Sequence, residues 1–161
     1  MAIVADFGKL TTVNAYEKLI SEKVFDMDIG IIICNAGYNI KGNTKDLTNA
    51  EVEDIINVNC LQNIYLAKAL LENIRARSKR SGFIIVGSSL GTFPCPGAVP
   101  YSASKVFASF IGQGLSWELE EYCDILIYEP AVVASNFRQD KRQSFFIISS
   151  EKAATCALRD L

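Results

Sequence analysis

The chain has 161 residues, half of them hydrophobic, and a formal net charge of −2. This length suits one domain with a packed core, and the near balance of 16 basic and 18 acidic residues argues against a nucleic-acid partner. The sequence has no histidine, which excludes a Ser-His-Asp triad, and its five scattered cysteines form no C-x-x-C pair, so we expect free thiols and no metal site.

Strand and helix patterns alternate along the first third of the chain. The apolar run 2–5 predicts a buried strand, and Thr12 or Asn14 then caps a helix with apolar residues at helical spacing. The run 29–34 has apolar residues on both faces, which predicts a central parallel strand covered on both sides. It ends at Asn35-Ala36-Gly37, small residues at which the backbone turns or meets a ligand.

The remaining elements continue this alternation. Thr48 begins a capping box, and the helix that follows runs, with a break near Asn59, to about Lys79. The other expected elements are a strand over 82–87, a loop with Pro94, Pro96 and Pro100, a helix over 101–122, a strand over 124–128 and a helix from 150 to 161. This order predicts an α/β fold with a doubly wound parallel sheet, in which ligands bind at the carboxyl ends of the strands.

Tyr101 and Lys105 form a candidate proton-transfer pair. They are four residues apart, so in a helix their side chains leave the same face. A neighbouring cation favours a phenolate, so we expect Lys105 to lower the pKa of Tyr101 and let it exchange protons. Ser88, thirteen residues upstream of Tyr101, could supply a hydroxyl to the same place. Composition makes one such Tyr-Lys pair unsurprising, so the pair alone is also typical of a solvated helix face.

A second motif suggests a different chemistry. Gly87-Ser88-Ser89-Leu90-Gly91 matches the G-x-S-x-G nucleophile elbow of serine hydrolases, with Ser89 as the nucleophile. The elbow must lead directly into a helix, but prolines at 94 and 96 indicate a loop, and the chain has no histidine to act as the base. We therefore keep the hydrolase only as an alternative.

Five segments, taken together with their order and spacing, resemble the short-chain dehydrogenase/reductase family. They are Asn35-Ala36-Gly37, Val58-Asn59, Ser88, Tyr101-Ser102-Ala103-Ser104-Lys105, and Pro130-Ala131-Val132-Val133-Ala134-Ser135, which is similar to the family's P-G-x-V-x-T segment. The resemblance spans essentially the whole chain and implies a Rossmann-like fold. Residues 93–96 and Lys105-Val106-Phe107 look most like the branch of very-long-chain 3-oxoacyl-CoA reductases and 17-beta-hydroxysteroid dehydrogenases.

The resemblance implies an NAD(P)-dependent carbonyl or alcohol oxidoreductase. Tyr101 would protonate the substrate carbonyl, Lys105 would lower the pKa of the tyrosine, Ser88 (or else Ser89) would hold the carbonyl oxygen, and Asn59 would position a water linking Lys105 to solvent. The cofactor-binding residues implied are Asp6, Asn35, Ala36, Gly37, Tyr101, Lys105, Pro130, Val133 and Ser135. Several have structural alternatives, since Asp6 could cap a turn, Asn35 could tie strands together and Ser135 could cap a helix.

The same resemblance sets expectations for ligands and partners. We expect NADP(H) rather than NAD(H), a 3-oxoacyl, acyl-CoA or steroid-like ketone or alcohol as substrate, and a homodimer formed through helices 61–79 and 101–122. The chain itself shows no signal-peptide pattern, which suggests the cytoplasm, whereas full-length relatives suggest association with the endoplasmic reticulum membrane.

One expected motif is absent. The family's glycine-rich phosphate-binding turn does not occur in this sequence, so we expect residues 1–161 to form a single partial Rossmann-like domain without the first two βα units and the last strand. Such a chain would hold the catalytic half and be inactive by itself. The rival hypothesis is a non-catalytic derivative that acts as an interaction module.

Overall fold

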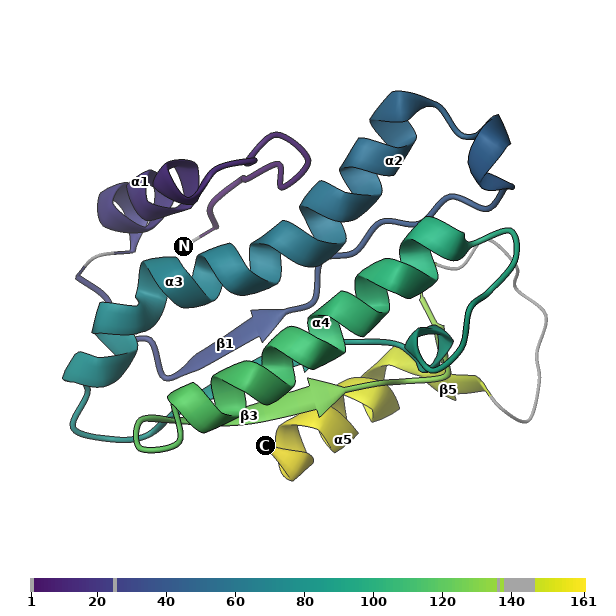
Figure 1. Cartoon of the computed structure of the whole chain (residues 1–161). Helices are drawn as coiled ribbons and strands as arrows, with labels where there is room; N and C mark the ends of the chain where they lie inside the picture. Colours follow the sequence, from purple (N-terminus) through teal and green to yellow (C-terminus); the bar gives the residue numbers. More distant parts are fainter. Residues whose placement is uncertain (1, 25, 136, 138–146) are drawn as a thin grey trace.

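The computed structural model describes residues 2–24, 26–135, 137 and 147–161 (Figure 1). Its elements in chain order are α1 (Val13–Lys23), β1 (Ile31–Cys34), η1 (Thr44–Asp46), α2 (Asn49–Ile56), the π-helical segment η2 (Asn57–Leu61), α3 (Gln62–Ala76), β2 (Ser81–Val86), η3 (Ser89–Gly91), α4 (Val99–Glu118), β3 (Cys123–Tyr128), β4 (Val132–Ala134), β5 (Ile147–Ser149) and α5 (Ser150–Asp160).

The main sheet has three parallel strands in the order β1-β2-β3. The register pairs Ile32 with Phe83 and Phe83 with Ile125. A second, two-stranded parallel sheet joins β4 to β5. Because the three main strands are parallel, their carboxyl ends lie at one edge, and the segments that follow them meet there.

Helices cover both faces of the main sheet. Figure 1 shows α1, α3 and α4 on one side and α5 on the other. The core under α1, α3 and α4 is built on the side chains of Ile32, Phe83 and Ile85, which point to one face because side chains alternate along a strand. On the opposite face, Leu161 lies so close to Gly82 that a Cβ at this glycine would be 2.5 Å from Leu161 Cδ2. These layers and parallel strands confirm the predicted α/β class.

Two expectations for the first strands were wrong. Residues 2–5 form no strand and Val4 is 99% exposed, because no described strand lies beside this segment to bond its backbone. Within the described sheet β1 pairs only with β2 and is an edge strand rather than a central one. Ile31 and Ile33 are 53% and 49% exposed, because α1 and α3 cover only the face that carries Ile32 and Cys34.

The local signals for helices are confirmed. Thr12, rather than Asn14, caps α1 through its hydroxyl, and Thr48 forms the full capping box with Glu51. The expected break near Asn59 is the π-helical segment between α2 and α3. The helix expected over 101–122 is α4, which begins two residues earlier and ends at Glu118. All five cysteines are free, as expected.

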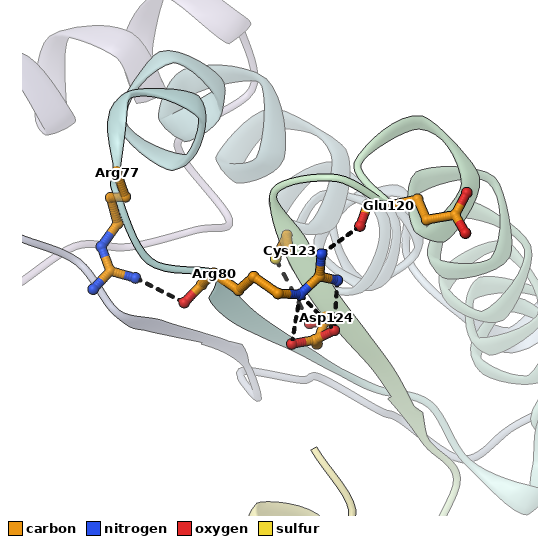
Figure 2. Close-up of polar contacts among 5 residues, drawn as sticks. All are labelled: Arg77, Arg80, Glu120, Cys123 and Asp124. Carbon is orange, nitrogen blue, oxygen red and sulfur yellow. Dashed lines mark hydrogen bonds and ion pairs between the residues drawn. The ribbon is translucent and has the colours of Figure 1, made fainter.

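Ion pairs tie the loops together at the amino-terminal edge of the sheet. Figure 2 shows Arg80 donating to both carboxylate oxygens of Asp124 and, over 2.6 Å, to the backbone carbonyl of Glu120. Arg77 donates to the Arg80 carbonyl and forms a second ion pair with Asp28. The guanidinium of Arg80 holds the pKa of Asp124 below its usual value. These contacts join the turn before β2 to the turn before β3, at the edge opposite the candidate site.

Among the described residues, no helix combines the length and the apolar character needed to cross a lipid bilayer.

Candidate active site

Tyr101 and Lys105 lie on a buried face of α4. The helix begins near Pro100, a residue suited to a first helical turn, and this places Tyr101 immediately inside it. The two side chains are only 7% and 5% exposed, and Lys105 Nζ is 5.6 Å from the centre of the Tyr101 ring. A solvated helix face would leave both side chains in water, so their burial favours a functional pair.

Lys105 reaches across to the end of β2. Its Nζ donates to the carbonyl oxygen of Val86 over 2.8 Å. Burial of the ammonium lowers the pKa of Lys105 to about 8. An ammonium has three N–H groups, and within the described part of the chain one is given to Val86, which leaves two.

Ser88 is within hydrogen-bond reach of the Tyr101 side chain. It is buried, follows the end of β2, and accepts a hydrogen bond at Oγ from the backbone N–H of Leu90. Burial raises the pKa of Tyr101, and a hydrogen bond with Ser88 opposes that rise. The expectation that Lys105 would give Tyr101 a lowered pKa was therefore wrong for this arrangement, because loss of water around the hydroxyl outweighs the favourable contacts.

Ser89 plays a different part from Ser88. Its backbone N–H donates to the carbonyl of Pro130 over 3.1 Å, and the residue begins the short 3-10 turn η3. A nucleophile elbow requires a strand followed directly by an α-helix. The local structure therefore gives the hydrolase alternative no support.

The side-chain amide of Asn59 is hydrogen-bonded within the protein through both its oxygen and its nitrogen. The residue is 1% exposed and lies in the π-helical segment. Its Oδ1 accepts from the backbone N–H of Tyr38 over 2.8 Å, and its Nδ2 donates to the Tyr38 carbonyl at 2.8 Å and to Ser104 Oγ at 2.9 Å. Ser104 in turn donates to the Tyr101 carbonyl. Asn59 thus joins the segment after β1 to the start of α4.

Two further amides support this arrangement. Asn63 Nδ2 donates to the Asn59 carbonyl over 2.8 Å, and Gln62 Nε2 donates to the carbonyls of Ala36 and Val58. Both side chains are buried. The sequence analysis missed these residues, although amide side chains at 57, 59, 62 and 63 within the otherwise apolar stretch 55–67 were a visible signal.

The 35–37 segment lies beside Lys105. A Cβ on Gly37 would be 3.6 Å from Asn59 Oδ1 and 3.8 Å from Lys105 Nζ. Ala36 is held by Gln62, whereas Asn35 is exposed. A backbone turn close to a buried ammonium with spare N–H groups fits the hydroxyls of a cofactor ribose.

The segment after β3 also approaches the site at its start. Pro130 is placed by the bond from Ser89, and Val133 continues in β4, paired with Ile148. Ser135 is exposed just after β4. The Phe137 ring lies 6.1 Å from the Tyr101 ring, centre to centre.

Asp6 caps a turn, which the sequence analysis gave as its structural alternative. Its Oδ1 accepts from the backbone N–H of Gly8 over 3.0 Å, and its carboxylate pairs with Lys9 on the surface. No hydrogen bond of the described residues joins Asp6 to Tyr101, Lys105 or the 35–37 segment.

Comparisons with known proteins point to one family. The family model for short chain dehydrogenase matches residues 1–144. The very-long-chain 3-oxoacyl-CoA reductase of Podospora anserina is 29% identical over 147 residues, which cover 89% of this chain and 42% of that protein. The 17-beta-hydroxysteroid dehydrogenase type 3 of Danio rerio is 30% identical over 121 residues, covering 72% of this chain and 38% of that protein.

Solved structures agree as well. A short-chain dehydrogenase from Sphingobium yanoikuyae in complex with NADPH is 25% identical, with a TM-score of 0.81 over 96% of this chain and 61% of that chain. A 4-hydroxyisoleucine dehydrogenase complexed with NADH is 18% identical and similar in fold, with a TM-score of 0.69 over 80% of this chain and 57% of that chain.

The chain spans less than half the length of the two named relatives. Within that span, the family match covers the strands β1 to β4 and the helices α1 to α4, including Asn59, Ser88, Tyr101 and Lys105. The chain belongs to the short-chain dehydrogenase family of oxidoreductases, in the branch of the very-long-chain 3-oxoacyl-CoA reductases and 17-beta-hydroxysteroid dehydrogenases.

Proposed function

We propose that the whole protein containing this chain is a nicotinamide-dependent oxidoreductase that interconverts a ketone and an alcohol. The observation that carries this proposal is the burial of Tyr101 and Lys105 on one face of α4 with Ser88 beside the tyrosine hydroxyl. Three groups that hold or transfer protons meet at the carboxyl end of β2, the edge at which open parallel sheets bind ligands.

Tyr101 would act as the proton donor in reduction. Burial raises the pKa of its phenol, so the hydroxyl keeps its proton at neutral pH and can give it to a carbonyl oxygen. Ser88 would donate a hydrogen bond to the same oxygen, where negative charge develops. The nicotinamide cofactor, when bound, supplies the hydride.

Lys105 would serve both the tyrosine and the cofactor. With a pKa of about 8 its ammonium predominates at pH 7, and its charge stabilises the phenolate left when the proton has gone. Its two remaining N–H groups would bind the ribose hydroxyls next to Gly37.

Asn59 would act through its backbone. Because its side-chain amide is held by Tyr38 and Ser104, we assign the water that would link Lys105 to solvent to the backbone carbonyl oxygen of Asn59. That oxygen is placed by the hydrogen bond that it accepts from the Asn63 side chain. The proton given up by Tyr101 would return through this water and Lys105.

The proposal extends to the substrate and the cofactor. We assign a 3-oxoacyl-CoA or a steroid-like ketone as the substrate, supported by the names of the two relatives. We assign NADP(H) rather than NAD(H), supported by the NADPH in the Sphingobium structure. Because the 4-hydroxyisoleucine dehydrogenase structure contains NADH, both cofactors are tested in the assay. The 161-residue chain, which has no glycine-rich phosphate turn, would not be active by itself.

The proposal also includes a homodimer formed through α3 and α4. Val106, Phe110 and Trp117 are exposed along α4, and this apolar surface is suited to burial against a second copy. The whole protein would associate with the endoplasmic reticulum membrane, as the resemblance to its branch implies.

The proposal is tested by assaying the purified whole protein. NADPH absorbance is followed with a 3-oxoacyl-CoA and with a steroid ketone, NADH is tested in parallel, and light scattering gives the oligomeric state. We expect NADPH to be oxidised with at least one of the two ketones. A folded dimer that reduces neither substrate with either cofactor would contradict the proposal and favour the interaction module, to which the exposed face of α4 is suited.

A further inference from the structure

A contact next to the Tyr101–Lys105 pair joins three residues: Ser109, Glu129 and Gly87. Ser109 lies one turn after Lys105 in α4, Glu129 follows β3, and Gly87 follows β2. Each is thus within one turn or one residue of a group assigned to the site, yet none belongs to the site described above.

The contacts among these three residues are close. Ser109 Oγ lies within hydrogen-bond distance of Glu129 Oε1 and is 3.0 Å from the Lys105 carbonyl. A Cβ on Gly87 would be 2.9 Å from Glu129 Cγ and 3.4 Å from Ser109 Oγ, so the Glu129 methylene group rests on the Gly87 backbone. The Gly87 N–H donates to the Tyr128 carbonyl over 2.8 Å.

The Ser109 hydroxyl has one proton and two possible acceptors. Ser109 can donate to the Glu129 carboxylate or to the Lys105 carbonyl, but not to both at once. The charged acceptor makes the stronger bond, and the Lys105 carbonyl lies inside a helix that supplies its own N–H donors. The Ser109–Glu129 bond therefore links α4 to the end of β3.

We infer that Ser109 and Glu129 are positioning residues that hold the peptide between Val86 and Gly87 in place. The Val86 carbonyl of that peptide is the acceptor for Lys105 Nζ at 2.8 Å. Glu129 contacts one side of the peptide, and its hydrogen bond with Ser109 holds it against α4, the helix that carries Lys105. The pair thereby sets where the ammonium lies, and its effect on catalysis rests on the proposed function.

The first test needs no activity. Lysine is labelled with 15N, and the exchange of the Lys105 ammonium protons with water is followed by NMR in the purified chain. Loss of one hydrogen bond predicts exchange roughly three- to tenfold faster in Ser109→Ala and in Glu129→Leu. The double variant should exchange no faster than either single variant, because the two side chains share one bond.

Three control variants complete this test. Ser109→Thr keeps the hydroxyl and should stay near wild-type exchange, whereas Glu129→Gln keeps an acceptor oxygen without its charge and should lie between wild type and Glu129→Leu. Ser116 donates to the Gln113 carbonyl farther along the same helix, and Ser116→Ala should have no effect. Unchanged exchange in folded Ser109→Ala and Glu129→Leu, or fully additive effects in the double variant, would overturn the inference.

Kinetics of the whole protein then test the catalytic consequence. Ser109→Ala and Glu129→Leu should lower kcat roughly three- to tenfold and leave KM for the ketone unchanged. An unchanged kcat in an active enzyme would overturn the positioning role. A wild-type protein without ketone reduction would contradict the proposed function instead, and the exchange rates would still decide whether the pair holds Lys105.

Discussion

Replacing Asn59 with alanine should weaken the fold more than its single side chain suggests. The amide is 1% exposed and makes three hydrogen bonds, two to the Tyr38 backbone and one to Ser104. The alanine variant loses all three bonds at once. It also leaves the N–H and the carbonyl of Tyr38 without these partners.

The size of the effect follows from these contacts. A hydrogen bond contributes about 0.5–1.5 kcal/mol net, and a buried partner left unpaired costs more. Because Tyr38 is half-buried and water can replace part of what is lost, we expect the free energy of unfolding to fall by about 2–4 kcal/mol. For a chain of this size that corresponds to a melting temperature lower by about 5–15 °C.

Urea and thermal unfolding followed by circular dichroism measure this change. Asn57 is the matched control, because its amide lies in the same π-helical segment and makes one bond, from Nδ2 to the Gly8 carbonyl over 3.1 Å. Asn57→Ala should cost about 0.5–1.5 kcal/mol. If Asn59→Ala destabilises the chain no more than Asn57→Ala does, the bonds to Tyr38 and Ser104 do not hold the site together as described.

Three further outcomes are expected. Gly112→Ala should destabilise the chain relative to Gly114→Ala, because a Cβ at 112 would lie 2.5 Å from Ile127 Cγ1 while nothing lies within 4 Å at 114; equal melting temperatures would contradict the packing of α4 on β3. Burial lowers the pKa of Lys105 from 10.5 to about 8, so between these pH values the unfolded chain binds a proton that the folded chain lacks. We therefore compare the free energies of unfolding of wild type and of Lys105→Met, and expect the wild-type value minus the variant value to rise between pH 8 and pH 10.5. A difference that does not change with pH would mean that the Lys105 amine is solvated in the folded chain. Finally, calorimetric titration of the 161-residue chain with NADPH should give binding weaker than micromolar, because its sequence lacks the phosphate turn, and a micromolar dissociation constant would reveal another phosphate site.

The features that could be predicted from sequence are local ones. The caps at Thr12 and Thr48 depend on a side chain and a backbone N–H three residues away, so the spacing alone indicates them. The common face of Tyr101 and Lys105 follows from the helical repeat in the same way. The family spacing favoured Ser88 over Ser89; Ser88 hydrogen-bonds the Tyr101 side chain, and its role in the reaction stays a prediction.

The features that could not be predicted depend on distant parts of the chain. The apolar run 2–5 and the exposed faces of Ile31 and Ile33 look like buried strand in the sequence, but burial requires a neighbour that the run itself does not specify. The three-residue pairing of β4 with β5 is too short to leave a periodic pattern. The raised pKa of Tyr101 reflects loss of water, which the spacing to Lys105 does not reveal.

The most direct measurement is the turnover of Tyr101→Phe in the whole protein, with its NADPH affinity measured alongside. The hydroxyl is the assigned proton donor, whereas the ring is buried and packs as phenylalanine would, so we expect ketone reduction to be abolished while NADPH binding changes little. Tyr122→Phe is the control, because this half-buried tyrosine packs against the core and beneath the Arg75 guanidinium, near the end of α4 away from Tyr101, and it should keep wild-type turnover. Turnover of Tyr101→Phe close to that of wild type would contradict the assignment of Tyr101 as the proton donor.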